Sequence, residues 1–221
     1  MSIRRTATAT VVAPIVAATA GLAAVVATGA HRRLGATAAE AQAALPGDDL
    51  LPGAQVQNDR ACTIAAPPSA VWPWIAQLGQ NKAGFYSFEG LENLVGCQIT
   101  GADRIHPEWQ DVAVGDRFTL HPDVALRVAE VQPGHALVVS SQGADAPGDM
   151  DFETTWVFCL KPVTTTTGSS ATRLHLRERY ATSNRATRAI IEVTGVISAV
   201  MTWRMMTNLR ALVGRSVDAP R

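Results

Sequence analysis

The chain has 221 residues, of which 47% are hydrophobic and 17% charged. It is therefore long enough for one domain with an appendage, and apolar enough for a substantial core. Basic and acidic residues both number 19, so the formal net charge is zero. Because nucleic-acid partners are usually met by an excess of positive charge, we expect no nucleic-acid binding. The three cysteines lie far apart and form no zinc-type spacing with the histidines, so we expect no metal and no cofactor.

The N-terminal residues 6–30 contain no charged side chain and are flanked by two arginines on each side. A bilayer-spanning helix needs about 20 apolar residues, which this segment supplies. We expect residues 1–33 to form an uncleaved single-pass anchor that places the protein in a membrane. Two alternatives stay open: a signal peptide cleaved at the A-x-A sequence of residues 36–38, which would give a secreted protein, and a soluble Ala-rich helix.

Residues 34–57 are expected to form a linker, because Pro-Gly pairs at 46–47 and 52–53 interrupt an Ala-rich beginning. Residues 58–213 are expected to hold one folded domain, and residues 214–221 a disordered tail. The domain opens with a predicted short strand over Arg60–Ala65. Two predicted helices follow, over Ser69–Leu78 and Phe88–Leu94, the first with an apolar face of spacing i, i+3, i+4, i+7.

After Asp116 the hydrophobic period changes to two, which predicts a series of strands. The predicted strands are Arg117–His121, Leu126–Val131, His135–Ser140, Thr154–Lys161 and Thr172–Tyr180. A long helix over Arg188–Val213 ends the domain. Strands gathered between two short helices and one long helix are typical of an α+β fold.

Two segments carry a family resemblance: AAPPSAVWPWIAQLGQNKAGFYSFEGLENLVG over 65–96 and ADRIHPEWQDVAVGD over 102–116. They resemble the opening of the SRPBCC superfamily, in an actinobacterial branch with APP-x-x-VWPW, LEN and ADRI-x-PEWQ. These START-like helix-grip proteins are often labelled polyketide cyclase/dehydrase or lipid transport. The resemblance implies a curved antiparallel sheet wrapped around the long C-terminal helix. It also implies a small apolar ligand that is a lipid, polyketide-like or an isoprenoid.

The last helix is uncharged from Val193 to Trp203 and apolar around its whole axis. Such a helix is buried on several sides or faces lipid. Under the family resemblance, one face would pack on the sheet while another lines a cavity, with Ile197 and the adaptable side chains of Met201 and Met205 in its wall. The alternative is an ordinary core helix.

Alternation along the strand from Arg173 to Tyr180 separates two faces. One face carries Leu174, Leu176, Glu178 and Tyr180, and the other carries Arg173, His175, Arg177 and Arg179. We expect the basic face to be solvated and Glu178 to point toward the covered side of the sheet. A carboxylate there must be paired or protonated. Either it is a pocket group with a tuned pKa, or it belongs to a structural ion pair, with Arg104, Tyr86 and Tyr180 as candidate partners.

Four tryptophans and one histidine complete the candidate residues. Periodicity places Trp74 and Trp156 in the core, while Trp72 lies off the helix face and could sit at a cavity mouth. Trp109 and His106 belong to the ADRI-x-PEWQ segment, which either caps a pocket entrance or braces a loop; His106 is either a general base or an ordinary histidine.

Together these residues predict a membrane-tethered domain that binds a small apolar ligand. The expected ligand contacts are Trp72, Tyr86, Arg104, Trp109, Trp156, Glu178, Tyr180, Ile197, Met201 and Met205. Two alternatives stay open. The first is a cyclase- or dehydratase-like enzyme whose acid/base groups are drawn from Glu178, Tyr180 and His106, and the second is a structural module with a filled interior. We favour binding over catalysis, because no familiar catalytic motif is present in the sequence.

Overall fold

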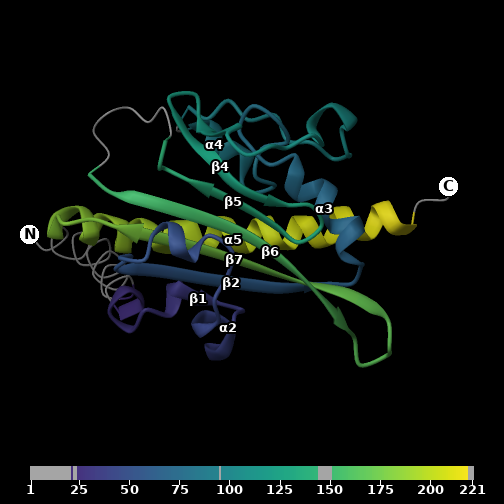
Figure 1. Ribbon diagram of the computed structural model, residues 1–221, viewed down its shortest axis with the longest axis horizontal. Coiled ribbons are helices and arrows are strands. Elements are labelled where there is room, and N and C mark those ends of the chain that lie inside the picture. The colour runs from purple at the N-terminus through teal and green to yellow at the C-terminus, as the bar shows by residue number, and fades with distance from the viewer. Residues whose placement is uncertain (1–20, 22–23, 95, 144–150, 219–221) are drawn as a thin grey trace, which may run out of the picture.

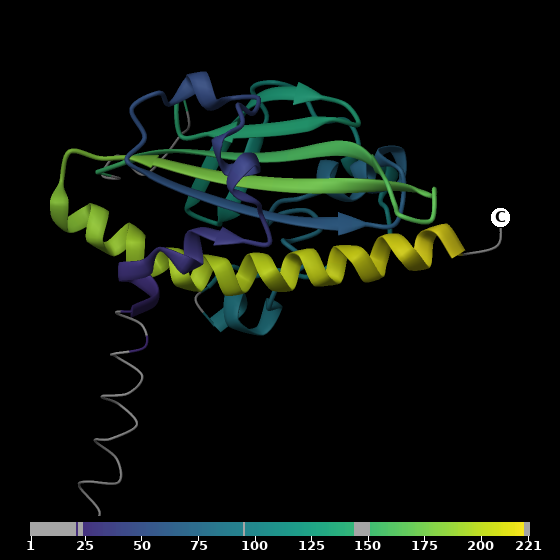
Figure 2. The same cartoon turned by 90° about the horizontal axis from the view of Figure 1, so that it is seen from below.

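A seven-stranded curved sheet forms the centre of the computed structural model, which describes residues 21, 24–94, 96–143 and 151–218. The strands lie in the order β1-β2-β7-β6-β5-β4-β3, and one long helix, α5 (Arg185–Asp218), runs along the inner face of the sheet (Figures 1 and 2). Only β1 (Arg33–Leu34) pairs in parallel, with β2, so the sheet is mixed. The predicted α+β helix-grip architecture is confirmed.

All predicted strands form, with ends that differ by a few residues. Their bounds are β2 (Val56–Ile64), β3 (Arg117–His121), β4 (Val124–Gln132), β5 (Ala136–Ser140), β6 (Glu153–Thr164) and β7 (Ser170–Ala181). Register shifts interrupt the β3–β4 and β4–β5 pairs. Such bulges bend a sheet and increase its twist, which helps this edge curl over the helix.

The helices also form where the apolar spacing predicts them. In α3 (Pro68–Ala76), the side chains of Val71, Trp74 and Ile75 are fully buried against the sheet. The short helix α4 (Glu89–Leu94) and the 3-10 turn η3 (Pro107–Trp109) belong to the long connection between α3 and β3. The last helix continues through Asp218, so most of the expected disordered tail is helical.

The segment expected as a linker carries regular structure. It contains η1 (Ala30–Arg32), β1, α2 (Ala38–Gln42) and η2 (Asp48–Leu50). A capping box between Thr37 and Glu40 starts α2, and α2 lies beside β2 and β7 in Figure 1. Residues 24–28 are helical as well, whereas most of the expected membrane anchor lies outside the described residues.

The outer face of β7 is covered, so the prediction of a solvated basic face is wrong. The Arg177 guanidinium is 2% exposed and bonds Asp59 Oδ1 from Nε at 2.8 Å and Asp48 Oδ2 from Nη1 at 2.6 Å. It also donates to the carbonyls of Glu40, Ala41 and Ala43. Strand alternation separates two faces but does not reveal which of them another segment will cover.

One further ion pair holds this outer layer, and a polar contact joins β7 to β2 beneath it. Arg173 makes a bidentate pair with Glu40, at 2.7 Å from Nε to Oε1 and 2.8 Å from Nη2 to Oε2. This hydrogen bonding lowers the pKa of Glu40 to about 2. His175 Nε2 lies 2.8 Å from Asp59 Oδ1. The segment 33–50 therefore packs on the sheet through charged groups and through an apolar cluster that joins Leu45 to Val138, Val157 and Cys159, whereas the inner face packs on α3 and α5 through apolar side chains.

Candidate functional site

Two adjoining hollows lie between the inner face of the sheet and α5, with volumes of about 330 and 290 Å³. They share Leu120, Trp156, Glu178 and Ser198, so we treat them as one inner cavity. The first is also lined by Phe85, Ser87, Glu92, Cys97, Ile197, Met201, Thr202 and Met205. The second is also lined by Val124, Leu126, Phe152, Thr154 and Tyr180. The lining is mainly apolar, and the size suits a small ligand.

Helical spacing and strand alternation place these side chains. Ile197, Met201 and Met205 are four residues apart along α5, so they project from one side of the helix. Trp156 projects from β6, and its ring centroid lies 4.5 Å from that of Phe158 and 6.1 Å from that of Phe85. Flexible methionines on one wall and tilted aromatic rings on the other make a surface that can accommodate apolar ligands of varied shape.

Glu178 is the centre of a polar network in the wall of the cavity. Its Oε1 lies 2.8 Å from Arg60 Nη1 and accepts a hydrogen bond of 2.7 Å from Ser198 Oγ. Its Oε2 accepts from Asn58 Nδ2 at 3.2 Å and from the Tyr180 hydroxyl at 3.4 Å. Asn58 and Arg60 come from β2, where Asn58 is directly opposite Glu178 in the strand register.

The network determines the protonation of both titratable groups. Burial raises the pKa of Glu178, but the Arg60 charge and the hydrogen bonds from Arg60, Ser198 and Asn58 outweigh burial and leave that pKa below its ordinary value. Burial, and then the Glu178 charge, raise the pKa of Tyr180. At neutral pH the cavity therefore contains an ionised, neutralised carboxylate beside a protonated phenol.

Two of the expected Glu178 partners lie elsewhere. The Tyr86 hydroxyl donates to the Trp74 carbonyl at 3.1 Å and accepts from Gln77 Nε2 at 2.8 Å. The same Gln77 amide donates to the Arg104 carbonyl at 3.0 Å. Tyr86, Arg104 and the buried Gln77 thus tie the ADRI segment to α3, and Arg60 is the cation that pairs with Glu178.

Two more expected contacts, Trp109 and Trp72, and the candidate catalytic residue His106 also lie outside the inner cavity. The His106 ring stacks on Trp109 with centroids 4.1 Å apart, and its Nδ1 lies 3.1 Å from Glu108 Oε1. Both rings border a polar surface hollow with Arg104. Trp72 packs against the core from α3. Of the expected ligand contacts, the structure brings together Trp156, Glu178, Tyr180, Ile197, Met201 and Met205.

Sequence reasoning missed Glu92, the second carboxyl group in the cavity wall. It projects from α4, it is 8% exposed, and its Oε2 is buried with no hydrogen-bond partner among the described residues. Burial, reinforced by the neighbouring Glu89 charge, raises the pKa of Glu92 to about 7. A helix as short as α4 gives no periodic pattern that would have placed this side chain.

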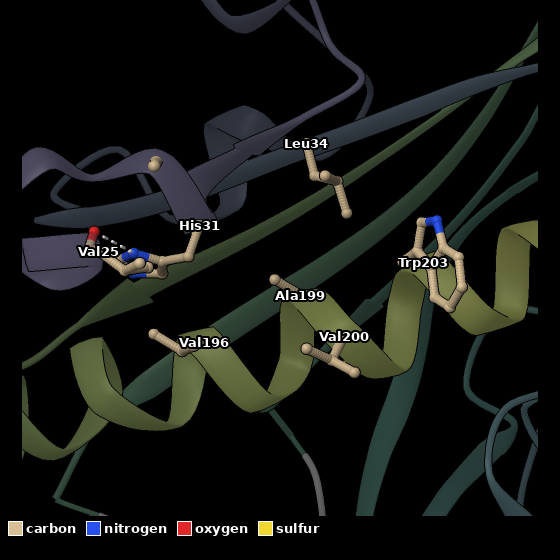
Figure 3. A pocket seen from close by; sticks show the side chains of 8 residues that line it. Val25, His31, Leu34, Val196, Ala199, Val200 and Trp203 are labelled. Atoms are coloured by element: carbon tan, nitrogen blue, oxygen red, sulfur yellow. Dashed lines mark hydrogen bonds between the residues drawn. The ribbon is translucent and has the colours of Figure 1, made fainter. Parts of the chain in front are cut away.

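A separate apolar hollow of about 340 Å³ lies on the other side of α5. Figure 3 shows Val25, His31 and Leu34 facing Val196, Val200 and Trp203 of α5 across it. Several large side chains of α5 are exposed, namely Ile190, Val193, Ile197, Val200 and Trp203, and of these Val200 and Trp203 border this hollow. Arg32, whose Nε donates to Glu192 Oε2 at 3.0 Å, fixes η1 to the same helix.

Within the part of the chain that the structure describes, α5 is the one helix long and apolar enough to cross a membrane, over Arg185–Val217. The core helix of a soluble protein meets the same criteria, so length and composition alone do not place α5 in a bilayer. No group of three or more His, Cys, Asp or Glu residues that could hold a metal ion occurs among the described residues.

Comparison with known proteins gives structural likenesses only. No family model and no curated protein matches the chain. A protein from Mesorhizobium loti is similar over 73% of this chain and 98% of its own, with 20% identity and a TM-score of 0.38. One from Thermobifida fusca has 14% identity and a TM-score of 0.43, covering 72% and 93% of the two chains. One from Nitrosomonas europaea has 15% identity and a TM-score of 0.41, covering 74% and 97%.

Proposed function

We propose that this protein binds a small, largely apolar ligand in the inner cavity between the sheet and α5, while residues 6–30 tether it to a membrane. The observation that carries the proposal is the cavity itself, whose two parts measure about 330 and 290 Å³ and have mainly apolar walls. The resemblance to the SRPBCC superfamily favours a lipid, a polyketide-like molecule or an isoprenoid as the ligand.

The three residues expected as acid/base groups support binding over a cyclase- or dehydratase-like reaction. Glu178 is neutralised by Arg60 and saturated with hydrogen bonds, so it is poorly suited to take up a proton. Tyr180 has a raised pKa and is therefore a weak acid at neutral pH. His106, the third candidate for acid/base work, lies outside the cavity against Trp109.

The outer side of α5 supports the membrane tether. The described N-terminal residues, the helix α4 and the outer side of α5 lie on one side of the sheet in Figure 2. Exposed apolar side chains are found on both helices, namely Leu91 and Leu94 on α4 and Val193, Val200 and Trp203 on α5. An apolar surface that includes Val25 and Ala30, which lie at the end of the uncharged run in the sequence, suits contact with lipid.

The binding proposal can be tested by filling the cavity. Met205 lines it and is 2% exposed, so Met205→Trp should occupy the ligand volume. We expect the full chain to bind a pyrene-labelled fatty alcohol, followed by fluorescence, and the variant to bind it at least tenfold more weakly. Val200→Trp, on the outer side of the same helix, is the matched control and should bind like the unaltered chain. Equal binding by all three proteins would refute the proposal.

A further inference from the structure

We infer that Glu92 is the polar recognition point of the inner cavity, and that it selects ligands whose apolar body ends in a hydroxyl group. The inference rests on the proposed function and narrows its ligand class. It follows from the position of Glu92 in the cavity wall, from its unused hydrogen-bonding capacity, and from the charges around it.

Glu92 holds an unused acceptor in an apolar setting. Its Oε2 is buried and has no hydrogen-bond partner among the described residues, while its neighbours in the cavity wall include Phe85, Cys97 and Met201. A buried carboxyl oxygen without a partner is unfavourable, and buried polar groups in proteins nearly always find one. A ligand hydroxyl that reaches Oε2 would supply the missing bond.

Glu178, the other carboxyl group in the cavity wall, has no oxygen without a hydrogen-bond partner. Both oxygens of Glu178 are occupied, Oε1 by Arg60 and Ser198 and Oε2 by Asn58 and Tyr180. A donor on the ligand would have to displace one of these partners to bond there. Of the two carboxyl groups, Glu92 is therefore the one expected to meet the polar end of the ligand, whose apolar body would lie against Met205. Trp156 Nε1, a buried donor of the same hollow, also has no partner among the described residues, and it could donate to the oxygen of a ligand hydroxyl.

The hollow that Glu92 lines is open to the surface of the protein. Ile197 lines the same hollow yet is 63% exposed, so the cavity reaches the surface beside it. On α4, Leu94 is 81% exposed although it follows Glu92 by only half a turn. A ligand entering tail first would thus leave its polar end near Glu92.

The surrounding charges favour a hydroxyl over a carboxylate. The neighbouring Glu89 carboxylate raises the pKa of Glu92 in the same direction as burial does. A ligand carboxylate at this place would face like charge in a poorly hydrated site, which is unfavourable. A hydroxyl can donate to Glu92 when it is ionised, and can donate or accept when it is protonated. An alkyl ammonium would have to be desolvated in an apolar cavity.

The test is a competition assay, in which unlabelled compounds displace the pyrene-labelled alcohol from the protein. The full chain is kept in solution by an amphipathic polymer at pH 7.5. The competitors share one chain length: decan-1-ol, its methyl ether, decanoic acid and decylamine. We expect the alcohol to compete about tenfold more strongly than the ether, which lacks the donor, and than the acid. Glu92→Leu should abolish the preference for alcohol over ether, and Glu92→Gln, which keeps an acceptor, should retain most of it.

Glu89→Gln is the matched control, since it alters a neighbouring carboxylate and should keep the preference for alcohol over ether. Three results would overturn the inference: equal competition by alcohol and ether, a preference that survives in Glu92→Leu, or tighter binding of the amine than of the alcohol. Failure of the proposed function has a different signature, because the pyrene probe itself would then not bind the unaltered chain. Thermal melting of each variant confirms that it is folded.

Discussion

The ion pair between Glu178 and Arg60 offers the sharpest test of how the inner cavity is built. Arg60 is 0% exposed and Glu178 is 5% exposed, with 2.8 Å between Nη1 and Oε1. At an effective dielectric constant of about 20, two unit charges at 2.8 Å attract by about 6 kcal/mol. Desolvation of both groups opposes most of this attraction. Removing one partner, however, leaves the other charge buried and should cost about 3–5 kcal/mol of unfolding free energy.

The perturbation is therefore a double-mutant cycle of Glu178→Gln, Arg60→Met and the double variant. Each single variant should lose about 3–5 kcal/mol at pH 7, and the double variant should lose less than the sum. The coupling energy should be about 2–3 kcal/mol, within the range for residues of one buried network. Urea unfolding of the full chain, followed by far-ultraviolet circular dichroism, gives all four values.

The pH dependence gives an independent check on the same pair. Because the pKa of Glu178 is lowered in the folded protein, its contribution is fully present above the ordinary pKa of about 4.5. It is lost as the pH falls through the folded value. The stability difference between the unaltered chain and Glu178→Gln should thus shrink in acid. A coupling energy below about 0.5 kcal/mol, or a difference that grows in acid, would refute this reasoning.

Three further predictions concern other parts of the molecule. The pKa of Glu92 is raised to about 7, so burial of its charge destabilises the fold above pH 7 and has no effect below pH 4.5. Relative to the unaltered chain, Glu92→Gln should therefore gain up to about 3 kcal/mol of unfolding free energy as the pH rises between those limits, measured by thermal melting. Glu40→Gln removes the Arg173 pair and should cost about 1–2 kcal/mol at neutral pH, with faster amide exchange in α2. The full chain should stay with membranes after an alkaline high-salt wash.

Each of these has a result that contradicts it. For Glu92, a stability gain independent of pH would mean that its carboxyl group titrates normally. For Glu40, whose pKa is lowered to about 2, the stability difference must close as the pH falls from 4.5 toward 2; a constant difference would leave no role for its charge. For the tether, release by the wash, or a mature chain that begins near Ala39, would support a cleaved signal peptide.

The inner face of β7 could be predicted because alternation is a local property. The alternation of a pleated strand is enough to put Leu174, Leu176 and Glu178 on one face and Arg173 and Arg177 on the other. The partner of Glu178 depends on which strand lies beside β7 and in which register. With β2 as that neighbour, Asn58 and Arg60 come within reach of Glu178, and Arg104 does not.

The covering of the outer face could not be predicted from the strand. It depends on α2 and η2, far away in the sequence, whose carbonyl and carboxylate oxygens meet Arg177. The family resemblance begins near residue 58, after this segment, and so gave no guidance on it. Glu92 was missed for a related reason, since the fold of the connection between α3 and β3, rather than a periodic pattern, brings it to the cavity.

The most direct test of the central claim is native mass spectrometry of the full chain purified from its own host. We expect a co-purified small molecule of lipid, polyketide-like or isoprenoid mass, released on denaturation and absent from Met205→Trp. Its chemical analysis would show whether a hydroxyl ends the apolar body. A chain that carries no such molecule and takes up none of the neutral apolar probes would contradict the claim that the inner cavity is a ligand site.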